Sequence, residues 1–82
     1  MARFYFHLVN DVDAPDEEGR ELPNLEADRE YARNCARRTI AETIKDEGRF
    51  NLDHRIDIEN EHGQVLDTVW FKDVVSVEGS ER

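Results

Sequence analysis

The sequence predicts an α+β domain in which a single long helix packs on a three- to four-stranded antiparallel sheet, in the order β-(β)-α-β-β. Three observations lead to this prediction. Apolar and polar residues alternate over 3–9, as in a half-buried strand. Apolar residues recur with helical spacing over 25–47. Residues 55–71 contain two strand-like runs around a short turn.

The first predicted strand is RFYFHLV at 3–9, which is dense in aromatic and branched residues. Successive side chains of a strand point to opposite faces. The set expected to face the core is Phe4, Phe6 and Leu8. The opposite face carries Arg3, Tyr5, His7 and Val9. Further on, RELP at 20–23 predicts a short second strand with Leu22 pointing inward.

The helix is expected over 25–47. Asn24 is a good N-cap, and Gly48 is a good C-terminal stop. Glu26 and Asp28 suit the positive end of the helix dipole. One stripe of the helix, flanked by Cys35 and Ile44, comprises Leu25, Ala32, Ala36, Thr39, Ile40 and Thr43. Its small residues allow the helix to lie close to a sheet.

A hairpin is expected after the helix. In RIDIEN at 55–60, Ile56 and Ile58 point inward, and Gly63 of the turn EHG is free to take a positive φ. The returning strand, 65–71, is apolar on both faces, which indicates a central strand or a face covered by a partner. Residues 74–77 are expected to continue the sheet or to form its edge.

Residues 3–75 resemble a family of short bacterial proteins of unknown function. The resemblance lies in the aromatic first strand ending in His-Leu, the segment DEEGRELPNLEAD entering a long helix, and the hairpin IDIENEHGQVLDTVWF. It implies an uncharacterised bacterial domain and transfers no functional residues. The strand pair followed by LPNLEAD and a helix is also similar to the antitoxin-like fold of the HicB type, without the DNA-binding segment that follows there.

The stretch NDVDAPDEEG at 10–19 crowds five carboxylates into ten residues. An EF-hand loop needs oxygen ligands at positions one, three and five, glycine at six and glutamate at twelve. Starting at Asp11, position five is Pro15 and position twelve is Leu22, so the motif fails. The stretch is interpreted as an exposed turn, and an irregular site for a divalent cation is the alternative.

The sequence does not predict an enzyme, a metal site or a cofactor. The lone Cys35 and the three histidines match no zinc-ligand spacing. Cys35 lies in the middle of the helix, away from the N-terminus that would lower the pKa of its thiol. The four glycines are isolated, so no phosphate-binding loop is present. A small hydrolase with paired carboxylates, or a metal-dependent enzyme, remains the alternative.

Length and charge set the remaining expectations. The 82 residues predict one domain over 1–78 and a disordered tail over 79–82. The net charge of −9 opposes binding to nucleic acid phosphates. The sequence contains no signal-peptide pattern, no apolar run of membrane-spanning length and a single cysteine, which together predict a cytoplasmic protein.

The sheet face without the helix is the predicted interaction surface. The residues expected there are Tyr5, His7, Val69 and Phe71. The alternation of the last strand leaves a second possibility, in which Leu66 and Trp70 face this side in place of Val65, Val69 and Phe71. One helix covers one face of a sheet, so the other face is expected to mediate self-association into a homodimer or to bind another protein. The predicted function is therefore a protein-interaction module. A nucleic-acid-binding or antitoxin-like regulatory module, stacking bases on strand aromatics, is the alternative.

A second surface is predicted on the helix. Arg29, Arg33 and Arg37 recur every four residues and form one ridge. Like charges at this spacing repel, so carboxylates are expected nearby. One possibility is the acidic stretch 11–21 folded back over the helix edge. The other is docking of an acidic protein or a phosphate.

Overall fold

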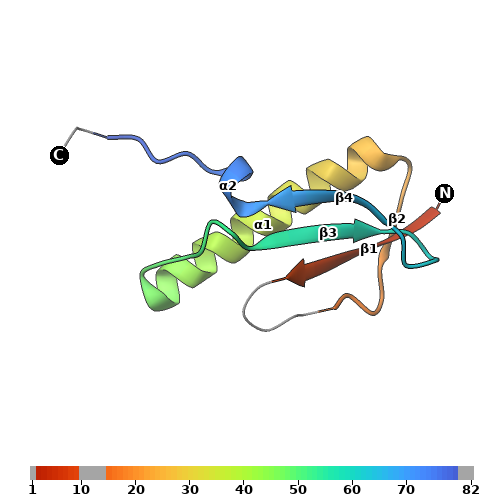
Figure 1. The fold of residues 1–82 in the computed structure, drawn as a ribbon, viewed down its shortest axis with the longest axis horizontal. Coiled ribbons are helices and arrows are strands. Elements are labelled where there is room, and N and C mark those ends of the chain that lie inside the picture. Colours follow the sequence, from red (N-terminus) through yellow and green to blue (C-terminus); the bar gives the residue numbers. More distant parts are fainter. Residues whose placement is uncertain (1, 10–14, 80–82) are drawn as a thin grey trace.

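A computed structural model describes residues 2–9 and 15–79 and confirms the predicted α+β fold (Figure 1). Its elements are β1 (Ala2–Val9), β2 (Arg20–Leu22), α1 (Leu25–Glu47), β3 (Arg55–Glu59), β4 (Val65–Trp70) and α2 (Phe71–Val74). The strands form one antiparallel sheet in the order β2-β1-β3-β4. Of the predicted tail, Gly79 is described, and 80–82 lie outside the described residues.

The sheet has β1 and β3 at its centre and β2 and β4 at its edges. The prediction of a second strand at 20–23 is confirmed by β2, which pairs with β1 over three residues. The prediction of a central position for the strand at 65–71 is wrong, because β4 pairs with β3 alone among the described strands. Its apolar residues lie on both faces of an edge strand: Val69 is buried on the helix side, and Trp70 lies on the opposite face.

Helix α1 has the predicted bounds, because both ends are set by local chemistry. The Asn24 side chain accepts a hydrogen bond from the Ala27 backbone N–H at 2.9 Å. At the other end, Gly48 adopts a φ of 76°, and its N–H donates to the Ile44 carbonyl at 2.8 Å. The left-handed conformation at Gly48 ends the helix and starts the loop to β3.

The core lies between α1 and one face of the sheet. It consists of Phe4, Phe6, Ala32, Ala36, Ile40, Ile56, Ile58, Val69, Phe71 and Val74. Ala32 and Ala36 are fully buried, which confirms that small residues let the helix lie close to the strands. The C-terminal part of α1 extends past the start of β3 (Figure 1). Ile44 therefore lies beyond the sheet and is 46% exposed.

The last strand ends one residue earlier than predicted, at Trp70. The Phe71 N–H still donates to the His54 carbonyl at 2.9 Å, but the chain then turns into α2. This turn buries Phe71 and Val74, three residues apart, in the core. The prediction that 74–77 continues the sheet is wrong: Val74 ends α2, and 75–79 form neither strand nor helix.

The hairpin turn between β3 and β4 is organised by Asn60. Its side-chain oxygen accepts hydrogen bonds from the backbone of His62 and Gln64 at 2.9 and 3.0 Å. Gly63 takes the predicted positive φ, 80°, and its N–H donates to the Asn60 carbonyl at 3.1 Å. A bulge between Ile58 and Glu59, just before this turn, shifts the register of the two strands.

Candidate functional site

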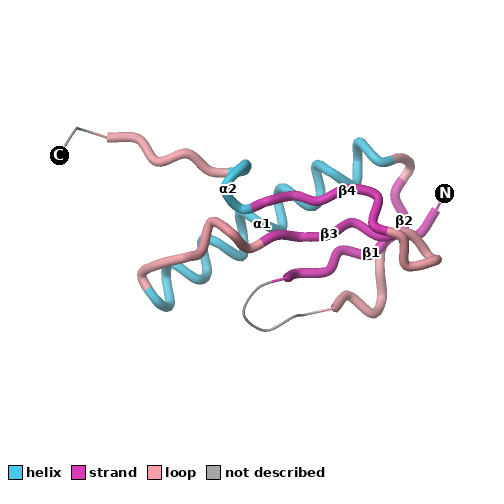
Figure 2. The backbone as a smooth tube through the Cα atoms, in the orientation of Figure 1, coloured by secondary structure: helices cyan, strands magenta, loops and turns pink. Residues whose placement is uncertain are grey.

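The face of the sheet opposite α1 is open (Figure 2). No described element crosses that face of the four strands. Cross-strand pairs in the register share a face, so the alternation around the buried core residues identifies the open side chains. They are Arg3, Tyr5, His7 and Val9 of β1, Glu21 of β2, Arg55, Asp57 and Glu59 of β3, and Val65, Thr68 and Trp70 of β4. We call this set the open face.

The centre of the open face is a network of polar side chains. Asp57 accepts hydrogen bonds from Arg55 Nε at 3.1 Å and from Thr68 Oγ1 at 3.0 Å. Only 13% of the Asp57 side chain is exposed, although no helix covers it. Nearer the other edge, Arg3 pairs with Glu21 at 3.2 Å. The charges on this face therefore neutralise one another within the sheet.

His7 connects the open face to the acidic stretch. Its Nδ1 accepts a hydrogen bond from the Asp16 backbone N–H at 2.9 Å, so Nδ1 carries no proton in this arrangement. The other ring nitrogen, Nε2, lies 3.3 Å from Glu59 Oε1. The imidazole is therefore held between a backbone donor and a carboxylate.

Asp16 explains part of the acidic stretch. Its carboxylate accepts hydrogen bonds from the backbone N–H groups of Phe6, Glu18 and Gly19 at 3.1–3.2 Å. The bond from Phe6 replaces a strand partner, because β2 pairs with β1 only as far as Phe4. Asp16 thus closes the edge of β1 and does not lie over the helix. Residues 10–14, including Asp11 and Asp13, lie outside the described residues.

Gly19 lets this loop approach the strand. Its φ is 69°, and a Cβ at this position would lie 2.8 Å from the Phe4 carbonyl oxygen. Any other residue would therefore push the loop away from β1. The glycine and Asp16 act together to hold 16–19 against the strand.

Aromatic rings lie on both outer parts of the open face. The rings of Tyr5 and His7 stack with centroids 6.5 Å apart and an angle of 8° between their planes. On β4, the Trp70 ring has the Arg55 guanidinium 5.4 Å and the Lys72 ammonium 5.7 Å from its centroid. These half-buried rings offer apolar area beside the polar centre.

Val69 and Phe71 do not belong to this surface, so their predicted place in the interface is wrong. Val69 pairs with Ile56 on the helix side and is 8% exposed, and Phe71 begins α2 and is 2% exposed. The bulge at Glu59 shifts the register, and a shift of one residue moves a side chain to the other face. Trp70 and Thr68 take the open positions on β4.

The arginine ridge lies along β4 and α2. Arg29 forms a hydrogen-bonded ion pair with Asp67 of β4, and Arg33 pairs with Glu30 at 3.2 Å. Arg37 Nε donates to the Val74 carbonyl at 3.1 Å. The prediction that the acidic stretch neutralises Arg29 is wrong for its described part, because Asp67 takes that role. The Arg29 hydrogen bond holds the pKa of Asp67 below its usual value.

The burial of Asp28 was not predicted from the sequence. Its side chain is fully buried, and neither carboxylate oxygen has a hydrogen-bond partner among the residues that the structure describes. Burial raises the pKa of this carboxyl above its usual 3.8. The sequence pattern indicated only a favourable charge at the helix N-terminus, since it does not show that this position faces the sheet.

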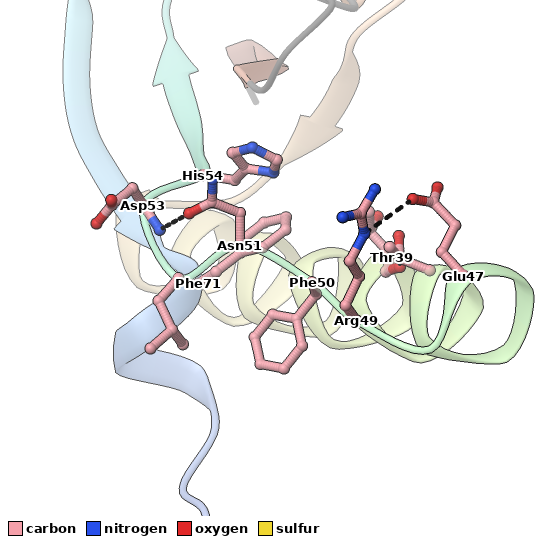
Figure 3. Close-up of a pocket in the computed structure, with 10 residues that line it drawn as sticks. Thr39, Glu47, Arg49, Phe50, Asn51, Asp53, His54 and Phe71 are labelled. Carbon is pink, nitrogen blue, oxygen red and sulfur yellow. Dashed lines mark hydrogen bonds and ion pairs between the residues drawn. The ribbon is translucent and has the colours of Figure 1, made fainter.

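A groove that no sequence pattern predicted lies beside the C-terminal part of α1 (Figure 3). Its volume is about 780 Å³. Its walls are Thr39, Thr43 and Glu47 of α1, the loop 49–54, and Phe71. The His54 ring packs edge-on against Phe71, with centroids 5.8 Å apart. We call this the α1–loop groove.

Neither metal-binding nor membrane-spanning features emerge from the described residues. Within 2–9 and 15–79, no three His, Cys, Asp or Glu side chains gather closely enough to hold a metal ion. In that same part of the chain, neither helix has the length and hydropathy that crossing a bilayer requires. Cys35 is half-buried, and burial, followed by the neighbouring Cys35 side chain, raises the pKa of Tyr31.

One long helix on an antiparallel sheet with a polar open face defines a small two-layer α+β domain. The chain belongs to the family described as a domain of unknown function (DUF6894), whose model matches residues 3–72. This confirms the resemblance to a family of uncharacterised proteins. No curated protein and no solved structure matches the chain. The resemblance to HicB-type antitoxins stays a prediction.

Proposed function

We propose that this protein is an interaction module that self-associates through the open face, with a second copy of the chain as the partner. The observation that carries the proposal is a four-stranded sheet covered by α1 on one side only (Figure 2). Tyr5, His7 and Trp70 add half-buried aromatic area on the other side. Surfaces of this kind, with aromatic groups around hydrogen-bonded polar groups, are typical of protein interfaces.

Charge favours this face as the place where two copies meet. Each chain carries a net charge of −9, so two copies repel one another in most orientations. On the open face, Arg3 and Arg55 stand among three carboxylates, Glu21, Asp57 and Glu59. The local charge is close to balanced, and a twofold axis can set the cations of one copy opposite the anions of the other.

The size of the face limits the strength of the association. Four strands about 4.8 Å apart and about 20 Å long give a footprint of roughly 400 Å². A standard interface takes about 800 Å² from each partner. We therefore propose a reversible dimer with a dissociation constant in the micromolar range or weaker, rather than an obligate one.

Light scattering over a concentration series tests the proposal. The mass should rise from 9.6 kDa towards twice that value between about 10 μM and 1 mM. Tyr5→Glu and Trp70→Glu should each keep the protein monomeric, since they add charge to the interface. Ala41→Glu adds the same charge on the exposed side of α1 and serves as the control. A constant mass of one chain at every concentration would contradict the proposal.

We further propose that the module acts without a cofactor in the bacterial cytoplasm, and that it is neither an enzyme nor a nucleic-acid binder. The acidic charge supports the last point, since duplex DNA binding relies on clustered Lys and Arg. Cys35 is a free thiol, in keeping with a reducing compartment. A shift of random duplex DNA by micromolar protein at about 150 mM salt would contradict the prediction on nucleic acid.

A further inference from the structure

The two edges of the sheet each carry a carboxylate on a backbone N–H group that faces outward. At one edge, Asp16 accepts a hydrogen bond from the Phe6 N–H at 3.2 Å, beyond the end of β2. At the other edge, Asp67 Oδ1 accepts one from the Thr68 N–H at 2.8 Å. Edge strands present backbone groups to other chains, and proteins close such edges to prevent unwanted pairing. The two aspartates therefore occupy positions where a further strand would bind.

The strand register shows that Thr68 faces away from β3. The Phe71 N–H donates to the His54 carbonyl at 2.9 Å, so these two residues form a hydrogen-bonded pair. Hydrogen-bonded and non-hydrogen-bonded pairs alternate along an antiparallel ladder. Trp70 and Thr68, one and three positions before Phe71, therefore direct their backbone groups outward. Since β4 pairs with β3 alone among the described strands, this outward row is the free edge of the sheet.

The Asp67 carboxylate is fixed in its position through both oxygens. Oδ1 receives the Thr68 N–H, and Oδ2 receives Arg29 Nε from α1. The Arg29 hydrogen bond also holds the pKa of Asp67 below its usual value. The carboxylate therefore stays ionised at neutral pH, which is the form that accepts hydrogen bonds most strongly. The helix thus orients the group that closes the strand edge.

Apart from this carboxylate, β4 lacks the features that guard an edge strand. Its residues, VLDTVW, include no lysine and no proline. Val65 is 54% exposed, Leu66 is 40% exposed, and Trp70 is half-buried. A segment rich in apolar and β-branched residues, with an outward-facing backbone, is the kind of edge to which another strand adds.

A second copy of β4 fits this edge. A twofold axis at Thr68 places the two Thr68 residues opposite each other, and Leu66 opposite Trp70 of the other copy. Asp67 then lies opposite Val69 of the other copy, so no two carboxylates face each other although each chain carries a net charge of −9. Threonine pairs stabilise antiparallel strands. This pairing needs the Thr68 N–H, which Asp67 holds.

We propose that Asp67 is a latch that blocks the pairing of β4 with β4 of a second copy. Its carboxylate occupies the backbone N–H at the centre of that pairing, so the closed latch directs self-association away from the sheet edge. The inference goes beyond the proposed function, and it holds whether or not the open face associates.

Light scattering of full-chain variants tests the latch. All of them carry Tyr5→Glu, which suppresses association through the open face. Asp67→Ala removes the cap on the Thr68 N–H, and its mass should rise with concentration from 9.6 kDa towards twice that value. Asp67→Asn changes the net charge equally, but its amide oxygen can still accept the Thr68 N–H. Its dissociation constant should be at least about tenfold higher than that of Asp67→Ala.

Two outcomes of this comparison would overturn the proposal. One is a mass of a single chain for Asp67→Ala at every concentration up to about 1 mM. The other is equal association of Asp67→Ala and Asp67→Asn, which would trace the effect to the lost charge and not to the lost cap.

Two further measurements locate the association at the edge of β4. Hydrogen exchange of the Trp70 amide in the Asp67→Ala variant should slow as the protein concentration rises, because this N–H enters the new ladder. Thr68→Pro added to Asp67→Ala should restore the monomer, since proline lacks the N–H and is tolerated where that group faces outward. Constant exchange at Trp70, or a dimer that survives Thr68→Pro, would place the association elsewhere and overturn the latch.

A second substitution guards against a variant that does not fold. Asp67→Val is measured beside Asp67→Ala, because a β-branched residue favours strand backbone and also lacks the acceptor. Circular dichroism identifies which of the two keeps the unmodified fold, and the mass of that variant decides the outcome. Loss of the fold in both would show that Asp67 supports the fold itself, and would also overturn the latch.

Discussion

The two faces of the sheet are made by alternate residues of the same strands, yet they carry different kinds of interaction. On the helix side, Phe6, Ile56 and Ile58 pack against α1, and the buried polar exception is Asp28. On the open side, His7, Asp57 and Glu59 form hydrogen bonds and ion pairs with their neighbours. The comparison indicates that stability resides mainly on one face, so the other face is free to serve recognition.

The largest expected change in the free energy of unfolding comes from Phe71, and its neighbour Trp70 on the open face provides the comparison. Phe71→Ala should lower the free energy of unfolding by about 3–5 kcal/mol, because it leaves a cavity in the core. Trp70→Ala should cost about 1 kcal/mol, because the ring is half-exposed. Urea unfolding monitored by circular dichroism measures both values. Similar losses for the two variants would remove the distinction between the faces.

The next largest change in the free energy of unfolding is expected at Asp28, the buried carboxyl on the helix side. Asp28→Ala should raise the free energy of unfolding at pH 7 by about 1–3 kcal/mol, because it removes a buried carboxyl without hydrogen bonds. The pKa of Asp28 is raised in the folded protein. Its contribution is therefore most favourable below the unfolded value of 3.8 and is lost as the pH rises through the folded pKa.

The advantage of Asp28→Ala should accordingly shrink as the pH falls through the folded pKa and be smallest below the unfolded value of 3.8. Urea unfolding of the variant and the unmodified protein at pH 7 and pH 3.5 provides the test. A variant that is less stable than the unmodified protein at pH 7 would show that the carboxylate has a favourable partner in solution.

A smaller effect is expected at the contact between the open face and the acidic stretch. Asp16→Ala removes the acceptor for three backbone N–H groups and should cost about 1 kcal/mol. Hydrogen exchange of the Phe6 amide should accelerate by more than that of the Ile58 amide, which lies in a central strand. Glu17→Ala on the same exposed loop is the control. Unchanged exchange at Phe6 would show that the strand edge is closed in another way.

The smallest effect is expected for the Arg29–Asp67 pair, because both side chains are partly exposed and salt screens them. Asp67 has a lowered folded pKa, so its stabilising contribution is present above the unfolded value of 3.8 and is lost as the pH falls through the folded pKa. This dependence is opposite to that of Asp28.

A double-mutant cycle tests this pairing. Arg29→Ala and Asp67→Ala should be non-additive at low salt, and the coupling should decrease at about 1 M salt. Arg29→Ala and Asp16→Ala should be additive, because Asp16 contacts β1 instead. Coupling between Arg29 and Asp16 would restore the original prediction that the acidic stretch covers the ridge.

The sequence by itself determined the features that depend on neighbouring residues. The bounds of α1 follow from Asn24 and Gly48, and the turn of the hairpin follows from Gly63. The alternation in β1 and β3 correctly placed Tyr5 and His7 opposite the core. These features were predictable because capping, turn conformation and side-chain alternation act within a few residues.

Only the tertiary structure decided which distant residues meet. The bulge at Glu59 assigned Val69 to the core and Trp70 to the open face, and α2 turned Phe71 inward. The partner of Arg29 and the burial of Asp28 likewise depend on how α1 is placed over the sheet. A register shift of one residue or a small rotation of a helix changes these contacts, and neither leaves a local pattern in the sequence.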